Sequence, residues 1–164
     1  MAKAKTSRQY WKCAILPILA FTLNEGLRFG RGVDYNSYYR AYHYVIDGDP
    51  LADGFEPFFK LLILIFGKVL GLEWQYFVAF MSFLLIFAAV LYFKQYKKYV
   101  AFALPLFAIM VVQAENVMRW FLAFSFALIG IAMFQNHKLN TTKRWIWLMA
   151  FFLLGFLTHY GFII

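Results

Sequence analysis

The sequence predicts an all-α protein, a polytopic bundle of about five transmembrane helices with an amphipathic helix at the external membrane interface. The composition is 63% hydrophobic and 23% aromatic with a mean hydropathy of +0.64, which is too apolar for a soluble domain. Several apolar runs approach the roughly 20 residues that a helix needs to cross a hydrocarbon core about 30 Å thick. Most of the 16 basic residues cluster in short connections between these runs, which is typical of cytoplasmic loops and not of a nucleic-acid surface.

Five apolar runs are the predicted spans, and together they form one membrane domain over residues 1–164. Residues 10–27 follow a basic start without a clear cleavage site, so we interpret them as a retained anchor. Residues 75–93 form a span that ends in lysines. Residues 99–113, 117–136 and 145–164 complete the set. The run over 99–113 is short, so one of its ends should lie below the membrane surface.

Residues 28–73 are the predicted external segment. Its first part is polar and rich in glycine and tyrosine, and residues 35–46 are expected to form a short helix. A polar connection of this length is uncommon without a function. In residues 56–72, Glu56, Lys60 and Lys68 project to one side at helical spacing, while Ile65 and Val69 project with other apolar residues to the other. We therefore expect an amphipathic helix that lies at the interface and does not cross the membrane.

The distribution of charge indicates on which side each connection lies. If residues 56–72 do not cross, the chain begins in the cytoplasm and all 8 acidic residues are external. In that arrangement most basic residues are cytoplasmic, as the positive-inside tendency requires. They are Lys3, Lys5, Arg8, Lys12, Lys94, Lys97, Lys98, Lys138, Lys143 and Arg144.

Arg119 is the strongest candidate for a functional residue. An arginine at the centre of a membrane helix costs about 2.5–3.5 kcal/mol on insertion scales, so such residues usually face a wet cavity or a charged ligand. The short preceding run places Arg119 below the outer surface, where we expect it to bind an anion. An ion pair with Glu115, one helical turn earlier, explains the position equally well. His159 near the outer end of the last run is a candidate base, although such a histidine more often bonds a backbone carbonyl.

The remaining polar residues give weaker signals. Asp34 follows Gly32 in the external segment, which is typical of turn chemistry. The nearby tyrosines either stack on sugar faces or pack at the membrane interface. Phosphate-loop, zinc-protease and nucleophile-elbow motifs are absent from the sequence, and Cys13 is its single cysteine. The sequence therefore predicts no cofactor and no metal site, and the acids at 47, 49 and 53 are more typical of an exposed turn than of a cation site.

Four short motifs in this order resemble the EpsG-like family of bacterial exopolysaccharide proteins. That family is related to Wzy-type exopolysaccharide and O-antigen polymerases and, more distantly, to membrane glycosyltransferases of the GT-C type. The resemblance extends over residues of about 10–164. The motifs are Gly32-Val33-Asp34-Tyr35 with Tyr38 and Tyr42, Glu56-Pro57-Phe58-Phe59, Asn116-Val117-Met118-Arg119 and Thr158-His159.

The resemblance implies a bacterial inner-membrane glycosyltransferase of polymerase type that joins undecaprenyl-diphosphate-linked sugars at the outer leaflet. It would act in exopolysaccharide or capsule biosynthesis, in the lipid bilayer, with other polysaccharide-assembly membrane proteins as further partners. Arg119 would contact the diphosphate, and His159 would assist nearby. The other implied residues are Asp34 and Glu56, as sugar ligands or as acid and base, and Asn116, Arg40 and Tyr38 as further substrate ligands.

Two features depart from the family. Trp120 follows Arg119 where the family usually has glutamine, and family members are about twice this length. We therefore expect the chain to be the N-terminal part of such a protein, which leaves open whether it is itself an enzyme. A flippase or transporter subunit for the same anionic glycolipid, or an inactive fragment, are the alternatives.

Overall fold

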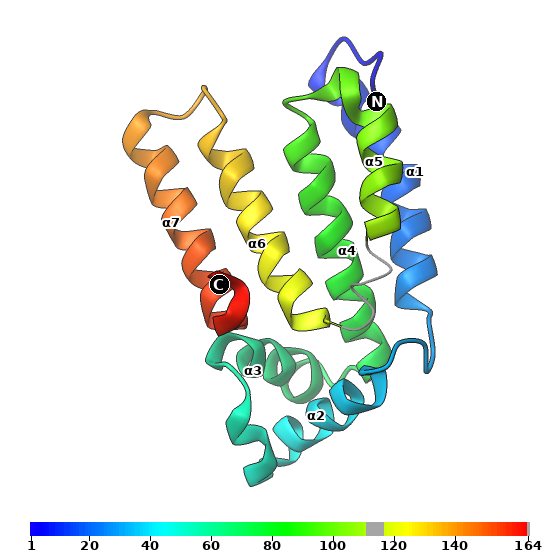
Figure 1. Ribbon diagram of the computed structural model, residues 1–164, viewed down its shortest axis with the longest axis vertical. Coiled ribbons are helices and arrows are strands. Elements are labelled where there is room, and N and C mark those ends of the chain that lie inside the picture. Colours follow the sequence, from blue (N-terminus) through cyan, green and yellow to red (C-terminus); the bar gives the residue numbers. More distant parts are fainter. Residues whose placement is uncertain (111–116, 164) are drawn as a thin grey trace.

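The computed structural model describes residues 1–110 and 117–163, and the regular elements within these ranges are all helical. Figure 1 shows α7, α6, α4 and α1 side by side in that order, with α5 beside α4. The bounds of these five helices are Ser7–Gly26 for α1, Trp74–Phe93 for α4, Val100–Met110 for α5, Met118–Phe134 for α6 and Thr141–Thr158 for α7. The predicted all-α class is therefore confirmed.

The two ends of the bundle differ in character. Figure 1 shows the N-terminus, the end of α4 and the connection between α6 and α7 at one end, which we call the basic end. Its connecting segments, residues 1–6, 94–99 and 135–140, hold Lys3, Lys5, Lys94, Lys97, Lys98 and Lys138. The opposite end holds the start of α6 and the end of α7, and we call it the site end.

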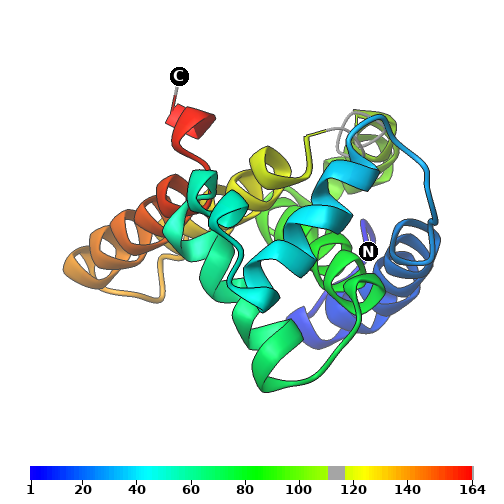
Figure 2. The same cartoon turned by 90° about the horizontal axis from the view of Figure 1, so that it is seen from below.

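Two shorter helices lie across the site end, as Figures 1 and 2 show. They are α2 (Tyr35–Asp47), close to the expected 35–46, and α3 (Pro57–Ile63), which continues as a π-helical stretch over Leu64–Val69. A 3₁₀ turn over Pro50–Gly54 joins them. Buried aromatic side chains attach these helices to the bundle, among them Tyr42, Phe59 and Phe77. Tyr42 also donates a hydrogen bond to the carbonyl of Leu72 at 2.7 Å.

The buried face of α3 differs from the face that helical spacing predicts. Glu56 was expected on the solvent side with Lys60 and Lys68, but it is buried against the bundle. Phe59 and Ile63 share the buried side, whereas Ile65 and Val69 are exposed. Hydrophobic periodicity cannot predict this arrangement, because the charge on Glu56 is compensated by partners from distant helices.

The last apolar run is not one helix. Helix α7 begins at Thr141, capped by the side chain of Asn140, which accepts a hydrogen bond from the Lys143 N–H at 2.8 Å. It ends at Thr158, and His159 has extended backbone before a 3₁₀ turn over Tyr160–Ile163. Helix α7 therefore covers the expected span 145–164 only as far as Thr158, and Ile164 lies outside the described residues. The break turns His159 out of the helix.

Helices α6 and α7 approach each other closely at glycines. A Cβ atom at Gly155 would lie 3.0 Å from the carbonyl oxygen of Ala123, and one at Gly130 would lie 3.0 Å from the Cβ of Phe151. Small residues permit such approach in membrane helix pairs. The close packing brings the first turn of α6 beside the last turn of α7, where Arg119 and His159 lie.

One described helix, α4, is both long and apolar enough to cross a membrane. Helix α6 is also apolar but has 17 residues. The last residues of the expected span 99–113 lie outside the described ranges. The count of five spans therefore stays a prediction.

Candidate functional site

Glu56 joins three distant parts of the chain at the site end. Its Oε2 accepts a hydrogen bond from Nη1 of Arg119 at 2.5 Å, and its Oε1 lies 2.9 Å from Nδ1 of His159. The backbone N–H of Tyr160 also donates to Oε1, at 3.3 Å. Both carboxylate oxygens are thus engaged, so Glu56 is a positioning group for two side chains that lie 63 and 103 residues further along the chain.

The three side chains of the charged site differ in how far they are exposed to solvent. The side chain of Glu56 is 7% exposed, whereas those of Arg119 and His159 are 23% and 27% exposed. The Glu56 carboxylate is therefore more deeply buried than the Arg119 guanidinium and the His159 imidazole, which are partly exposed to solvent. A ligand at this surface would meet the guanidinium and the imidazole before the carboxylate.

The surroundings of Glu56 favour its ionised form. Burial alone would raise the pKa of Glu56, but the hydrogen bond with His159, a backbone hydrogen bond and the charge and hydrogen bond of Arg119 together outweigh it. The pKa of Glu56 therefore lies below its ordinary value of 4.5. Glu56 is a carboxylate at neutral pH, which makes it a hydrogen-bond acceptor and not an acid.

Aromatic rings surround the guanidinium of Arg119. Its central carbon lies 5.2 Å from the ring centre of Phe55, 5.9 Å from that of Tyr38 and 6.0 Å from that of Phe59. Rings at this distance attract a cation and fix its plane. Within the described residues, Nε of Arg119 is buried without a hydrogen-bond partner. In the described part of the chain the guanidinium donates to Glu56 through Nη1, and a partly exposed guanidinium is suited to binding an anion such as a phosphate.

His159 presents its second ring nitrogen away from Glu56. A carboxylate that accepts from Nδ1–H holds the imidazole in the tautomer whose Nε2 is the basic atom. A Cβ atom at residue 161 would lie 3.2 Å from Nε2, so Gly161 leaves room beside this nitrogen. In chemical terms, the arrangement can remove a proton at Nε2 while Glu56 stabilises the imidazolium that results.

The structure brings together four of the predicted site residues, namely Glu56, Arg119, His159 and Tyr38. Asp34 occupies the N-cap position of α2 without a side-chain capping bond, and Arg40 is exposed on the same helix. In the described part of the chain, neither contacts the carboxylate or its two partners. Two other predictions, Asn116 as a ligand and Glu115 as the ion-pair partner of Arg119, fall outside the described residues.

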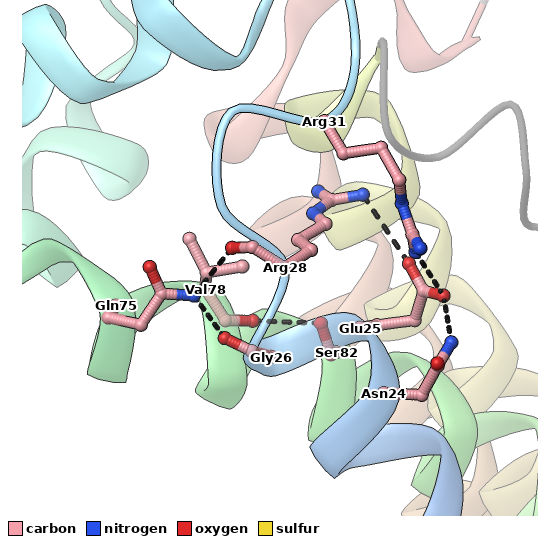
Figure 3. A network of polar contacts seen from close by, with 8 residues as sticks. All are labelled: Asn24, Glu25, Gly26, Arg28, Arg31, Gln75, Val78 and Ser82. Carbon is pink, nitrogen blue, oxygen red and sulfur yellow. Dashed lines mark hydrogen bonds and ion pairs between the residues drawn. The ribbon is translucent and has the colours of Figure 1, made fainter.

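A second polar network, which the sequence analysis did not single out, lies where α1 ends (Figure 3). The carboxylate of Glu25 accepts from Asn24 at 2.8 Å and Arg31 at 2.9 Å, and Arg28 lies 3.5 Å away. Gln75 at the start of α4 donates to the backbone carbonyls of Gly26 and Arg28. This network fastens the end of α1 to α4. In the sequence, this network is indicated by Asn24 and Glu25 at the end of one apolar run and by Gln75 at the start of another.

Within residues 1–110 and 117–163, no three histidine, cysteine or acidic side chains are grouped so that they could hold a metal ion. In the part of the chain that the structure describes, the side chains that bond the Glu56 carboxylate are one guanidinium and one imidazole. This set is suited to binding an anion and moving a proton.

The described helices form a bundle with a charged site at one end, and α4 is long and apolar enough to cross a membrane. The chain belongs to the EpsG family, whose sequence pattern matches residues 11–164, nearly the whole chain. The family resemblance of the sequence motifs is therefore confirmed, and EpsG is a family of Wzy-type membrane polymerases. No curated protein and no solved structure matches the chain.

Proposed function

We propose that this chain carries out, or contributes to, polymerase-type glycosyl transfer in exopolysaccharide or capsule biosynthesis, with undecaprenyl-diphosphate-linked sugars as substrates. Membership of the EpsG family supports this class of activity. The observation that carries the proposal is the pair of groups held by one carboxylate, since Arg119 and His159 both bond Glu56. An anion-binding cation beside a base is the combination that this transfer needs.

The proposed reaction breaks the bond between the anomeric carbon and the diphosphate of the donor. A hydroxyl oxygen of the acceptor sugar attacks that carbon, and its proton passes to Nε2 of His159. The lipid diphosphate leaves with the bonding electron pair. Arg119 stabilises the negative charge that develops on it, as preorganised donors do in acyl and phosphoryl transfer. Glu56 keeps both groups in place and stabilises the protonated imidazole.

We also propose that the site end faces the outer side of a bacterial inner membrane. The segments of the basic end carry lysines, and basic connections are retained in the cytoplasm. The site would then meet lipid-linked sugars at the outer leaflet. The membrane interface would lie near α2 and α3, which run across the end of the bundle.

The test replaces the two groups separately in the full-length protein and follows polymer length and lipid-linked repeat units in cells. We expect His159→Ala and Arg119→Gln to abolish elongation, with repeat units accumulating at the outer leaflet. His137→Ala, which changes an exposed histidine near the basic end, is the matched control and should leave elongation unchanged. Accumulation at the inner leaflet instead would favour the flippase, and wild-type polymer from both site variants would refute the proposed chemistry.

A further inference from the structure

An open pocket of about 560 Å³ lies beside the site and has no role in the reaction steps above. Its walls come from the end of the 3₁₀ turn, from α3 and its π-helical continuation, and from the turn that follows α7. The residues that matter for its chemistry are Asp53, Gly54, Phe55, Lys60 and Tyr160. Its size falls within the range of roughly 300–1,000 Å³ typical of small-molecule sites.

The pocket adjoins the charged site through two neighbouring residues. Phe55 directly precedes Glu56, and its ring lies 5.2 Å from the guanidinium carbon of Arg119. Tyr160 directly follows His159, and its N–H donates to Glu56. A molecule in the pocket would therefore lie next to Arg119, which is proposed to bind the diphosphate, and next to His159, which is proposed to accept the proton.

The lining of the pocket combines aromatic rings with a neutral pair of charges. Nζ of Lys60 lies 3.3 Å from Oδ1 of Asp53, so the two charges cancel and the pocket does not select an anion. The carboxylate accepts hydrogen bonds and the ammonium donates them, which suits a ligand with several hydroxyl groups. The rings of Phe55 and Tyr160 offer apolar faces, and the ring of Tyr160 belongs to a residue that is 48% exposed. Such faces suit the C–H side of a sugar ring.

We propose that this pocket binds a pyranose ring of the lipid-linked substrate, with Asp53 and Lys60 as hydroxyl ligands and an aromatic wall as the stacking surface. The assignment rests on the proposed function, because it places the sugar next to the diphosphate at Arg119. The ring belongs either to the donor or to the acceptor, and the chemistry of recognition is the same for both.

Gly54 offers a way to fill the pocket without disturbing the fold. A Cβ atom at this position would meet no heavy atom within 4 Å, and its φ is not in the left-handed region. Gly54→Trp should therefore fold normally and occupy the space of the ring. Ser37→Trp adds the same bulk to an exposed position of α2 and is the matched control. Asp53→Asn removes a sugar ligand, and Asp47→Asn makes the same change at an exposed position outside the pocket.

The experiment measures binding of methyl glycosides by saturation-transfer NMR, with the purified full-length protein in detergent. The probes are the methyl glycosides of glucose, galactose, rhamnose and N-acetylglucosamine. We expect at least one to bind the wild type, the Ser37→Trp variant and the Asp47→Asn variant. Its dissociation constant should rise at least fivefold in Asp53→Asn, and its signal should vanish in Gly54→Trp. Wild-type binding by Gly54→Trp, or no binding of any probe to the wild type, would overturn the proposal.

Two further arms separate the sugar pocket from the proposed reaction and the donor from the acceptor. His159→Ala should still bind the methyl glycoside. If the site variants bind the glycoside and also make wild-type polymer, the proposed reaction is refuted and the sugar pocket is not. With geranyl-diphosphate-linked glucose as the probe, weakened binding in Arg119→Gln but not in Arg8→Gln, which changes an exposed arginine near the basic end, would assign the pocket to the donor. If Arg119→Gln binds this probe as the wild type does, while Gly54→Trp and Asp53→Asn still bind the methyl glycoside poorly, the pocket is assigned to the acceptor.

Discussion

Replacing Glu56 by alanine should destabilise the protein strongly, because the side chains of Arg119 and His159 lose a hydrogen-bond partner in a largely buried site. The carboxylate is 7% exposed and accepts from Arg119, His159 and Tyr160. Removing one partner of a buried ion pair typically costs about 3–5 kcal/mol. We expect the lower part of that range, about 3 kcal/mol, because Arg119 is 23% exposed and water screens part of its charge. For a chain of this size, this corresponds to a decrease in melting temperature of about 6–12 °C.

The assay is thermal unfolding of the detergent-solubilised protein followed by near-ultraviolet circular dichroism. A double-mutant cycle with Glu56→Gln, Arg119→Gln and the combined variant isolates the pair, and we expect a coupling free energy of about 1–3 kcal/mol. Asp47→Asn removes an exposed carboxylate of the same segment and should leave the melting temperature unchanged. A Glu56→Ala protein that melts within 1 °C of the wild type, by the same conversion under about 0.5 kcal/mol, would refute the structural role of this carboxylate.

Three other predictions concern the pH dependence of stability, the end of α1 and the packing of α6 against α7. The folded-state pKa of Glu56 lies below its ordinary 4.5, so its contribution to stability is complete above that pH and is lost as the pH falls through the folded-state pKa. Melting curves between pH 7 and pH 3 should therefore show an acid-induced loss that Glu56→Gln reduces, and parallel curves would contradict it. Gln75→Leu removes the bonds to the carbonyls of Gly26 and Arg28, so it should cost about 1–3 kcal/mol and speed hydrogen exchange at the end of α1. An unaltered exchange rate there would argue against it. Gly155→Val forces α6 and α7 apart and should cost about 1–3 kcal/mol in a melting experiment, whereas Gly54→Ala meets open space and should not, so equal melting of the two would exclude the close packing.

The sequence was sufficient to predict the helical class and three groups of the charged site. A charged residue in an apolar chain is costly, so Arg119 was conspicuous from its position. His159 was a candidate base, although its position alone is more typical of a histidine that bonds a backbone carbonyl. Glu56 was a candidate only because the motif that it begins, Glu56-Pro57-Phe58-Phe59, resembles the EpsG-like family. The short helix over 35–46 was also predictable, because glycines and prolines mark both of its ends.

The partners of these residues were not predictable, because they are separated widely along the chain. Sequence spacing offered Glu115 as a partner of Arg119, since one helical turn separates them, and Glu115 lies outside the described residues. In the described part of the chain, Arg119 bonds the carboxylate of Glu56, 63 residues earlier. Tertiary packing of α3 against the bundle makes this pair, and no local pattern encodes it. The end of α7 at Thr158 was missed for a similar reason, because an apolar run continues past it without a glycine or proline at the break.

The long separations along the chain give the site an order of assembly. During synthesis Glu56 leaves the ribosome well before Arg119, and His159 follows last. In that interval the bonds that Arg119 and His159 make to the Glu56 carboxylate cannot yet form. The packing of the α6 and α7 hairpin against α3 brings these two partners to Glu56. A nascent polypeptide released before α7 is made would lack the constellation, so the folding of this hairpin is the step that completes the site.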